Sequence, residues 1–380
     1  MSGNTPVTVN RSLHWFAVLT ALFTFLLLGA GGLVTSHEAG MSVPDWPNSY
    51  GYNMFLFPPS QWIGGIFYEH THRLIASGVG LMTTVLAVWL WLKDPRKWMH
   101  WVGVAAFLLV VAQGVLGGLR VVLADAQLGI FHAIIGQLFF VLTAAIALFT
   151  GRWWQNWENI PHPTFNNQQP TVGNRPSAEK PDVGCSVLNV GCSLRRFVLF
   201  TTILILCQLI IGATMRQQHA GLSIPDFPLA YGKIWPDTSA ATVHSYNEHR
   251  MSVIAENPIT AFQIVLQMVH RLVALAVSVL IVACAWQARR QLGKKDPLAK
   301  LALFWLGLIL VQIFLGAATI WSNKAADVAT AHVLGGALSL VTGALWYIIA
   351  FRRSAVLPEI ATTTTISGAY GGAPAMAANK

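Results

Sequence analysis

Charged residues are scarce in this chain. Asp, Glu, Lys and Arg make up 10% of its 380 residues, and 54% of the residues are hydrophobic. In an ordinary soluble domain about a quarter of the residues are charged. The scarcity of charge therefore excludes a water-soluble globular protein and indicates a protein that crosses a membrane several times.

Cysteine is also rare, and its four positions exclude an external disulfide. Cys185 and Cys192 lie in a polar stretch, and Cys207 and Cys284 lie within apolar segments. None falls in the loops assigned below to the outer side of the membrane, where disulfides form. A cleavable signal is missing as well, because the first apolar segment has no Ala-x-Ala-like site. We therefore expect the first helix to be retained.

The chain does contain apolar stretches long enough to cross a hydrocarbon core, which takes about 20 residues. There are eight of them, at approximately residues 14–35, 70–92, 101–119, 129–150, 197–215, 263–287, 301–321 and 329–351. Only helices satisfy their own backbone hydrogen bonds inside lipid at these lengths. The sequence therefore predicts an all-α integral membrane protein with eight transmembrane helices.

Lys and Arg are distributed unevenly along the chain. The stretch 36–69 has none, whereas the two ends of the chain and the loops on one side of the spans hold most of them. Because basic residues stay on the cytoplasmic side, we predict a multi-pass protein of the inner membrane with both termini in the cytoplasm. The net charge of +9 mostly expresses this asymmetry, so it does not indicate nucleic-acid binding.

The sequence repeats itself. Residues 39–47 (AGMSVPDWP) return as residues 220–228 (AGLSIPDFP), and His-Arg-Leu occurs at 72–74 and again at 270–272. Several matches in the same order indicate a duplication. The Asp of each Pro-Asp motif is expected to bond its own turn, so that both loops form rigid lids over the sites.

The repeat predicts the domain organisation. We expect an N-terminal four-helix half (1–150), a proline-containing cytoplasmic linker (151–196), a C-terminal four-helix half (197–353) and a disordered cytoplasmic tail (354–380). With an even number of spans in each half, the two tandem bundles should be related by a pseudo-two-fold axis along the membrane normal.

Each half carries one histidine on its second helix and one on its fourth, about one turn inside the outer boundary. They are His72 and His132 in the first half, and His270 and His332 in the second. Two imidazoles at similar depth can approach one flat iron porphyrin from opposite faces, whereas zinc sites need three or four ligands. We therefore predict that these four residues are the metal ligands of two haem sites. Histidines that only hydrogen-bond between helices are the alternative.

Glu69 distinguishes the two halves. It lies three residues before His72, on the same face of the helix, and the matching residue before His270 is Gln267. A carboxylate can take up a proton or stabilise positive charge, which an amide cannot do. We predict that Glu69 is catalytic and that the first half is the reaction site. Capping of the helix start is the alternative role.

Arg73 and Arg271 directly follow the histidines of the second helices. A guanidinium group binds a carboxylate through two parallel hydrogen bonds, and porphyrin propionates are carboxylates. We predict that both arginines bind haem propionates, with interfacial snorkelling as the alternative.

This constellation resembles the haem A synthase family. The resemblance covers residues 11–353 and rests on the paired Pro-Asp loops and on Glu69, His72, Arg73, His132, His270, Arg271 and His332. It implies that the first half holds haem O as substrate and haem A as product, and that the second half holds a haem B cofactor. It also implies an oxidoreductase that turns a methyl group of haem O into a formyl group by successive hydroxylations, for cytochrome oxidase.

The same resemblance implies partners. They are haem O, the haem O synthase that supplies it and the assembly of cytochrome oxidase; the membrane electron donor is unknown, and a homo-oligomer is left open. Many members carry a cysteine pair in an outer loop, and this chain has none there. That departure excludes a thiol relay through the loop.

Two other classes of function use the same features. A di-haem electron carrier resembling cytochrome b or a ferric reductase would need the same four histidines but would change neither haem. A transporter or haem chaperone is disfavoured, because charges and helix breaks are sparse at the membrane midplane.

Overall fold

A computed structural model describes residues 10–155, 183–249 and 258–368 of the chain. Within these ranges the α-helices are α1 (Arg11–Ser36), α2 (Gly64–Lys93), α3 (Lys97–Val122), α4 (Ala126–Thr150), α5 (Arg152–Gln155), α6 (Val183–Gln217), α7 (Ala240–Glu248), α8 (Ala261–Leu292), α9 (Pro297–Trp321) and α10 (Ala326–Gly368). Short 3-10 turns occur at Met54–Leu56, Pro59–Gln61 and Ala220–Leu222.

Eight of these helices are long and apolar enough to cross a membrane: α1 to α4, α6 and α8 to α10. The prediction of an all-helical protein with eight candidate spans is therefore confirmed. The helix containing Glu69 begins at Gly64 rather than at the predicted residue 70, because a helix continues beyond its apolar part. Glu69 thus lies inside α2 and not at its start.

The helices also extend into the predicted linker and tail. The short helix α5 lies just after residue 151, α6 begins at Val183, and α10 continues to Gly368. Each added residue of a helix gains a backbone hydrogen bond, so a helix does not end where its hydropathy falls. Residues 156–182 and 369–380 lie outside the described residues, and the domain boundaries remain a prediction.

Polar residues cap the starts of several long helices, a few residues before the predicted apolar spans. The Asn10 side chain accepts from the Leu13 N–H at the start of α1, and Asp125 does the same for Gln127 in α4. Thr260 and Gln263 form a capping box at the start of α8. These caps satisfy amide groups that have no partner within the helix.

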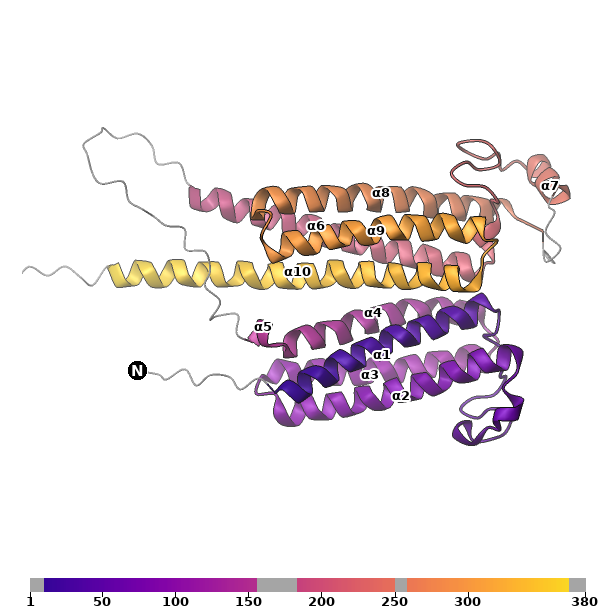
Figure 1. The fold of residues 1–380 in the computed structure, drawn as a ribbon, viewed down its shortest axis with the longest axis horizontal. Helices are drawn as coiled ribbons and strands as arrows, with labels where there is room; N and C mark the ends of the chain where they lie inside the picture. Colours follow the sequence, from indigo (N-terminus) through magenta and orange to yellow (C-terminus); the bar gives the residue numbers. More distant parts are fainter. Residues whose placement is uncertain (1–9, 156–182, 250–257, 369–380) are drawn as a thin grey trace, which may run out of the picture.

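The long helices lie side by side in two groups (Figure 1). Neighbouring helices among α1 to α4 pack against one another, and so do α6, α8, α9 and α10. Between the groups, α10 packs against α1 and α4, and α4 also packs against α6. The loop after α1 and helix α7 lie at one end of the molecule, and the turns α2–α3 and α8–α9 lie at the other.

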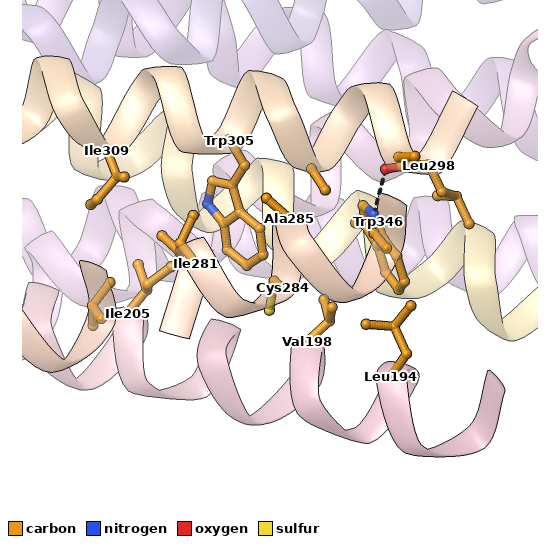
Figure 2. Packing of buried hydrophobic residues seen from close by; sticks show 14 of the residues in the cluster. Leu194, Val198, Ile205, Ile281, Cys284, Ala285, Leu298, Trp305, Ile309 and Trp346 are labelled. Carbon is orange, nitrogen blue, oxygen red and sulfur yellow. Dashed lines mark hydrogen bonds between the residues drawn. The ribbon is translucent and has the colours of Figure 1, made fainter. Parts of the chain in front are cut away.

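Large side chains fill the interior of the second group (Figure 2). Trp305 and Trp346 are almost completely buried, and their indole N–H groups donate to Ser339 Oγ and to the Leu298 carbonyl, each at 2.9 Å. A tryptophan is stable in a core when its N–H group has such a partner.

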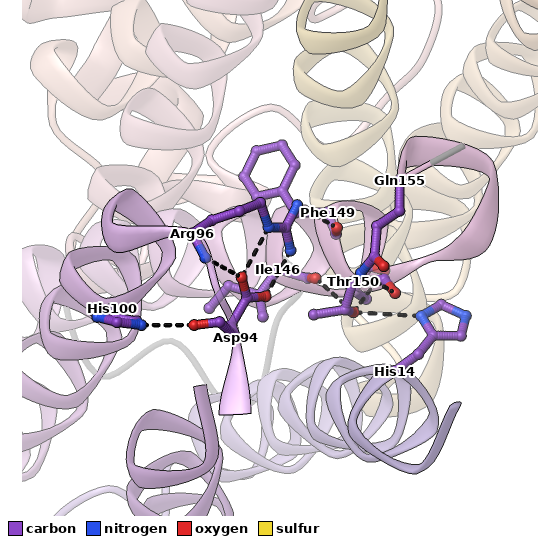
Figure 3. Close-up of polar contacts among 9 residues, drawn as sticks. His14, Asp94, Arg96, His100, Ile146, Phe149, Thr150 and Gln155 are labelled. Atoms are coloured by element: carbon purple, nitrogen blue, oxygen red, sulfur yellow. Dashed lines mark hydrogen bonds and ion pairs between the residues drawn. The ribbon is translucent and has the colours of Figure 1, made fainter. Parts of the chain in front are cut away.

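A polar contact links two connections of the first group (Figure 3). Arg96, in the turn between α2 and α3, donates to the Asp94 carboxylate of the same turn and to the Phe149 carbonyl of α4.

Candidate haem site

The structure brings the four predicted histidines together in two pairs. The ring centres of His72 on α2 and His132 on α4 lie 6.5 Å apart, with the ring planes at 82°. Those of His270 on α8 and His332 on α10 lie 6.3 Å apart, at 64°. Each pair joins the second and fourth long helix of one half, as the sequence predicts.

This separation suits two axial ligands of one metal ion. Two metal–nitrogen bonds of about 2 Å account for about 4 Å of the distance between the ring centres. The rest is the distance from each ring centre to its own nitrogen atom. Across the described ranges there is no group of three or more His, Cys, Asp or Glu side chains that could hold a metal ion. Each site therefore offers two imidazoles, a donor set that fits haem iron, which needs only axial ligands from the protein.

A glycine on the preceding helix lies under each histidine ring. A Cβ atom added to these glycines would lie 3.1–3.3 Å from a ring Cε1 atom, in the pairs Gly31–His72, Gly117–His132, Gly212–His270 and Gly316–His332. A larger side chain would push the ring away, so the close approach requires glycine. The sequence repeat matches Gly117 with Gly316, each four residues after a glutamine (Gln113 and Gln312), and the Gly117-Gly118 pair predicts the close approach of a helix or a porphyrin. Gly31 and Gly212 were missed, although each lies eight residues before an Ala-Gly pair.

Glutamines on the same helices contact two of the histidines. Gln208 Nε2 lies 3.0 Å from His270 Nδ1 and donates to the His270 carbonyl at 2.9 Å. Gln312 Nε2 donates to the His332 carbonyl at 2.7 Å. The repeat indicated Gln312 and its counterpart Gln113, but it did not indicate Gln208.

The two Pro-Asp loops have the same conformation. Asp45 accepts from the N–H groups of Tyr50 (2.7 Å) and Gly51 (2.8 Å), and Asp226 accepts from Tyr231 and Gly232 in the same way. The prediction that Asp bonds its own turn is confirmed. Partial burial opposes ionisation of Asp45, but the hydrogen bonds from Gly51 and Tyr50 and the nearby Arg73 charge keep its pKa below the ordinary value.

The first loop reaches α3, which packs against both helices that carry the histidine pair. A Cβ atom on Gly118 of α3 would lie 2.3 Å from Cδ2 of Trp46, so the indole covers this glycine. Gly118 follows Gly117, which lies under the His132 ring. The loop therefore lies against the end of the bundle where the histidines are, which is consistent with its predicted role as a lid.

Glu69 is buried and binds the first loop. Its side chain is 5% exposed, Oε2 accepts from the Val43 N–H at 2.9 Å, and Oε1 pairs with Arg73 at 2.8 Å. Gln267 makes the equivalent contact, since its Oε1 accepts from the Ile224 N–H at 2.7 Å. The carboxylate and the amide therefore share this anchoring contact. The amide also donates to the carbonyls of Gly221 and Ile224, whereas the carboxylate adds charge. Glu69 makes none of the contacts of a helix cap.

Arg73 and Arg271 also bind the loops. Arg73 donates to the carbonyls of Asp45 (2.7 Å) and Val43 (2.7 Å) as well as to Glu69, and Arg271 donates to those of Asp226 (2.8 Å) and Leu229 (2.9 Å). The sequence did not indicate these contacts, because a repeat does not reveal backbone carbonyls. The propionate role of the two arginines remains a prediction.

His70, next to Glu69, is completely buried under the first loop. Its Nδ1 atom lies 3.2 Å from Ser49 Oγ, and its ring packs against Phe57 and Trp62. It supports the loop and takes no part in the histidine pair.

Comparison with known proteins places this arrangement in a family. Residues 14–344 match the family described as cytochrome oxidase assembly protein. The chain belongs to this family. The match spans both halves, including all four paired histidines, so the family resemblance drawn from the sequence is confirmed.

Relatives of this cytochrome oxidase assembly protein are known in several bacteria. The haem A synthase of Lysinibacillus sphaericus is 22% identical over 343 residues, covering 90% of this chain and 95% of the relative. That of Geobacillus kaustophilus is 25% identical over 345 residues (90% and 92%), and that of Bacillus cereus is 25% identical over 368 residues (94% and 99%). The similarity thus extends over nearly the whole length of each relative.

Proposed function

We propose that this membrane protein is a haem A synthase, an oxidoreductase that converts haem O to haem A for cytochrome oxidase. The observation that carries the proposal is the duplicated histidine pair, in which, among the described residues, the buried residue three positions before the first histidine is a carboxylate in one half (Glu69) and an amide in the other (Gln267). Membership of the cytochrome oxidase assembly family and the haem A synthases among its relatives support the same activity.

The two halves are assigned different haems. His72 and His132 would hold haem O as substrate, and His270 and His332 would hold haem B as the resident cofactor. Haem B supplies one-electron redox chemistry when it is bound. The proposal places the reaction in the first half because the charged residue Glu69 lies there and the neutral Gln267 lies in the other.

The chain's own residues would perform three tasks. The histidines orient the substrate, the Pro-Asp loops exclude water from the end of each bundle, and Glu69 holds negative charge, or accepts a proton on a carboxylate oxygen, where a methyl group is oxidised. Arg271 would bind a propionate through its Nε–H and the Nη hydrogens that the loop carbonyls leave available. Arg73 would use its Nε–H, because its four Nη hydrogens are donated to the loop and to Glu69.

The arrangement in the membrane is part of the proposal. The two halves, 1–150 and 197–353, would be four-helix bundles related by a pseudo-two-fold axis along the membrane normal. Both termini would be cytoplasmic, and the haem sites would lie toward the outer side of the inner membrane. A haem O synthase would supply the substrate.

Chromatography of extracted haems tests the activity. Membranes that make haem O and contain this protein should yield haem A, and the double variant His72→Ala with His132→Ala should yield none. If haem O stays unchanged while two haems are bound, the protein is a di-haem electron carrier. If no haem is bound at all, both functions are wrong.

A further inference from the structure

Each of the four histidine rings lies against a glycine of a neighbouring helix, and three of these helices carry a glutamine at the same distance before that glycine. The residue four positions before the supporting glycine, one helical turn away on the same face, is Gln113 on α3, Gln208 on α6 and Gln312 on α9. On α1 it is Leu27. Leu27 and Gln208 are matched positions, because each precedes the Ala-Gly pair of its own half by the same number of residues.

Among the glutamine contacts of the described residues, that of Gln208 is the one that reaches a histidine ring. The amide of Gln208 contacts both the ring Nδ1 and the carbonyl of His270, at 3.0 and 2.9 Å. The Nδ1 atom of His72, the counterpart of His270, is buried and has no hydrogen-bond partner among the described residues, and the same holds for Nδ1 of His132 and of His332. Among the four described rings, only that of His270 has a glutamine side chain at Nδ1. Leu27 cannot provide one, because its side chain has neither a donor nor an acceptor.

A partner at Nδ1 matters when Nε2 binds a metal ion. The proton of the imidazole then sits on Nδ1, and this N–H needs an acceptor that fixes the ring and strengthens the ligand. A half-turn of the Gln208 amide, whose two ends have the same shape, offers its oxygen to that N–H in exchange for the hydrogen bond to the His270 carbonyl. His72 has no comparable group, so we expect it to be the weaker ligand of the two matched histidines.

We propose that Gln208 is a positioning residue that keeps haem in the second half, and that Leu27 at the matched place makes the first half the site that releases haem. This inference rests on the proposed function. A synthase must let its substrate in and its product out while it retains its cofactor. The difference between an amide and an isobutyl group at one position of the repeat would provide this distinction.

The test measures how fast purified full-length protein, loaded with haem B, loses haem to an excess of apomyoglobin. The second site is isolated by His72→Ala with His132→Ala, and the first site by His270→Ala with His332→Ala. In the second-site background, Gln208→Met keeps the length of the side chain and removes its hydrogen bonds. We expect it to speed haem loss by about 10- to 100-fold.

Two further variants and a matched control complete the design. Gln208→Glu restores an acceptor and should return the rate of loss toward that of the parent. In the first-site background, Leu27→Gln should slow haem loss by about 10-fold or more. The control is Ile203→Met in the second-site background, which places a methionine at an exposed position of the same helix and should change the rate by less than about threefold.

Several results would overturn the inference. The first is a rate of haem loss in Gln208→Met that equals that of its parent. The second is a rate in Gln208→Glu that stays as fast as in Gln208→Met, and the third is a rate in Leu27→Gln that is no slower than that of its parent. A melting curve identifies a variant that has unfolded, and Gln208→Glu then decides the outcome. If the rates change as expected but the parent protein makes no haem A, the proposed function is wrong and the inference stands.

Discussion

At the scale of single residues, Glu69 and Gln267 separate a structural role from a chemical one. Both side chains accept a hydrogen bond from a loop N–H group, and only Glu69 adds a charge that pairs with Arg73. A change from carboxylate to amide at residue 69 should therefore leave the loop anchored, as it is anchored in the second half.

Glu69→Gln is expected to lower haem A formation by about 10²-fold or more, the usual contribution of a group that transfers a proton. Haem binding should be retained. The measurements are haem chromatography and the haem content of the purified protein. Adding Gln267→Glu to this variant should not restore activity, because the carboxylate then lies in the other half. If Glu69→Gln forms haem A as fast as the parent protein, residue 69 only anchors the loop and has no chemical role.

The glycine under His332 provides a second prediction at this scale. A methyl group at Gly316 would lie 3.1 Å from the Cε1 atom of the ring, so Gly316→Ala should displace His332 and lower the haem content of the second half. Gly307→Ala on the same helix is the matched control, because a Cβ atom there meets nothing within 4 Å. Absorption spectra of the two purified variants compare their haem content, and equal content would contradict the role of the glycine.

At the scale of elements, the first Pro-Asp loop depends on an ionised carboxylate. The folded-state pKa of Asp45 is lowered, so the stabilisation is present above the unfolded value of about 3.9 and is lost as the pH falls through the lower folded value. Hydrogen exchange at Tyr50 and Gly51 should therefore accelerate in acid relative to Asp45→Asn, whose side chain does not titrate. If the ratio of the exchange rates of the parent and Asp45→Asn stays constant as the pH falls, the charge of Asp45 does not stabilise the loop.

The sequence predicted the elements better than the contacts between them. Hydropathy located all eight long helices, and the repeat located the four histidines and Glu69, because these signals are contained in the order of the residues. The sequence could not show that Arg73 binds loop carbonyls or that Gly31 lies under a ring, since both depend on how helices approach one another. Gln208 was missed because its counterpart is the apolar Leu27 and it lies far from His270 in the sequence, whereas Glu69 lies three residues before His72.

At the scale of the whole molecule, Arg216 of the second half is bound to the first. Its Nη2 atom donates to the Gly32 carbonyl and to Ser36 Oγ of α1, each at 2.8 Å. Arg216→Met should lower the free energy of unfolding by about 1.5–3 kcal/mol, the value of a hydrogen bond to a charged group. Denaturation in detergent measures this, with Arg196→Met at an exposed position of the same helix as control. Equal stability of the two variants would exclude a joining role for Arg216.

The orientation in the membrane is testable with cysteines placed at the two ends of the bundle. After replacement of the native cysteines, an impermeant thiol reagent added to the outer side should label Ser239→Cys, just before α7. It should label Lys294→Cys, in the α8–α9 turn, only after the membrane is opened. The reverse pattern would invert the proposed topology.

Neighbouring glycines of α1 serve different halves. Gly31 lies under the His72 ring, whereas a Cβ atom on Gly32 would lie 2.8 Å from Cγ2 of Thr330, two residues before His332. One turn of α1 therefore contacts His72 of the first site and the helix segment just before His332 of the second, and so fixes the distance between these two histidines. A chimaera assembled from the halves of two relatives would work only where this glycine doublet meets a matching partner, whatever the length of the chain that connects them.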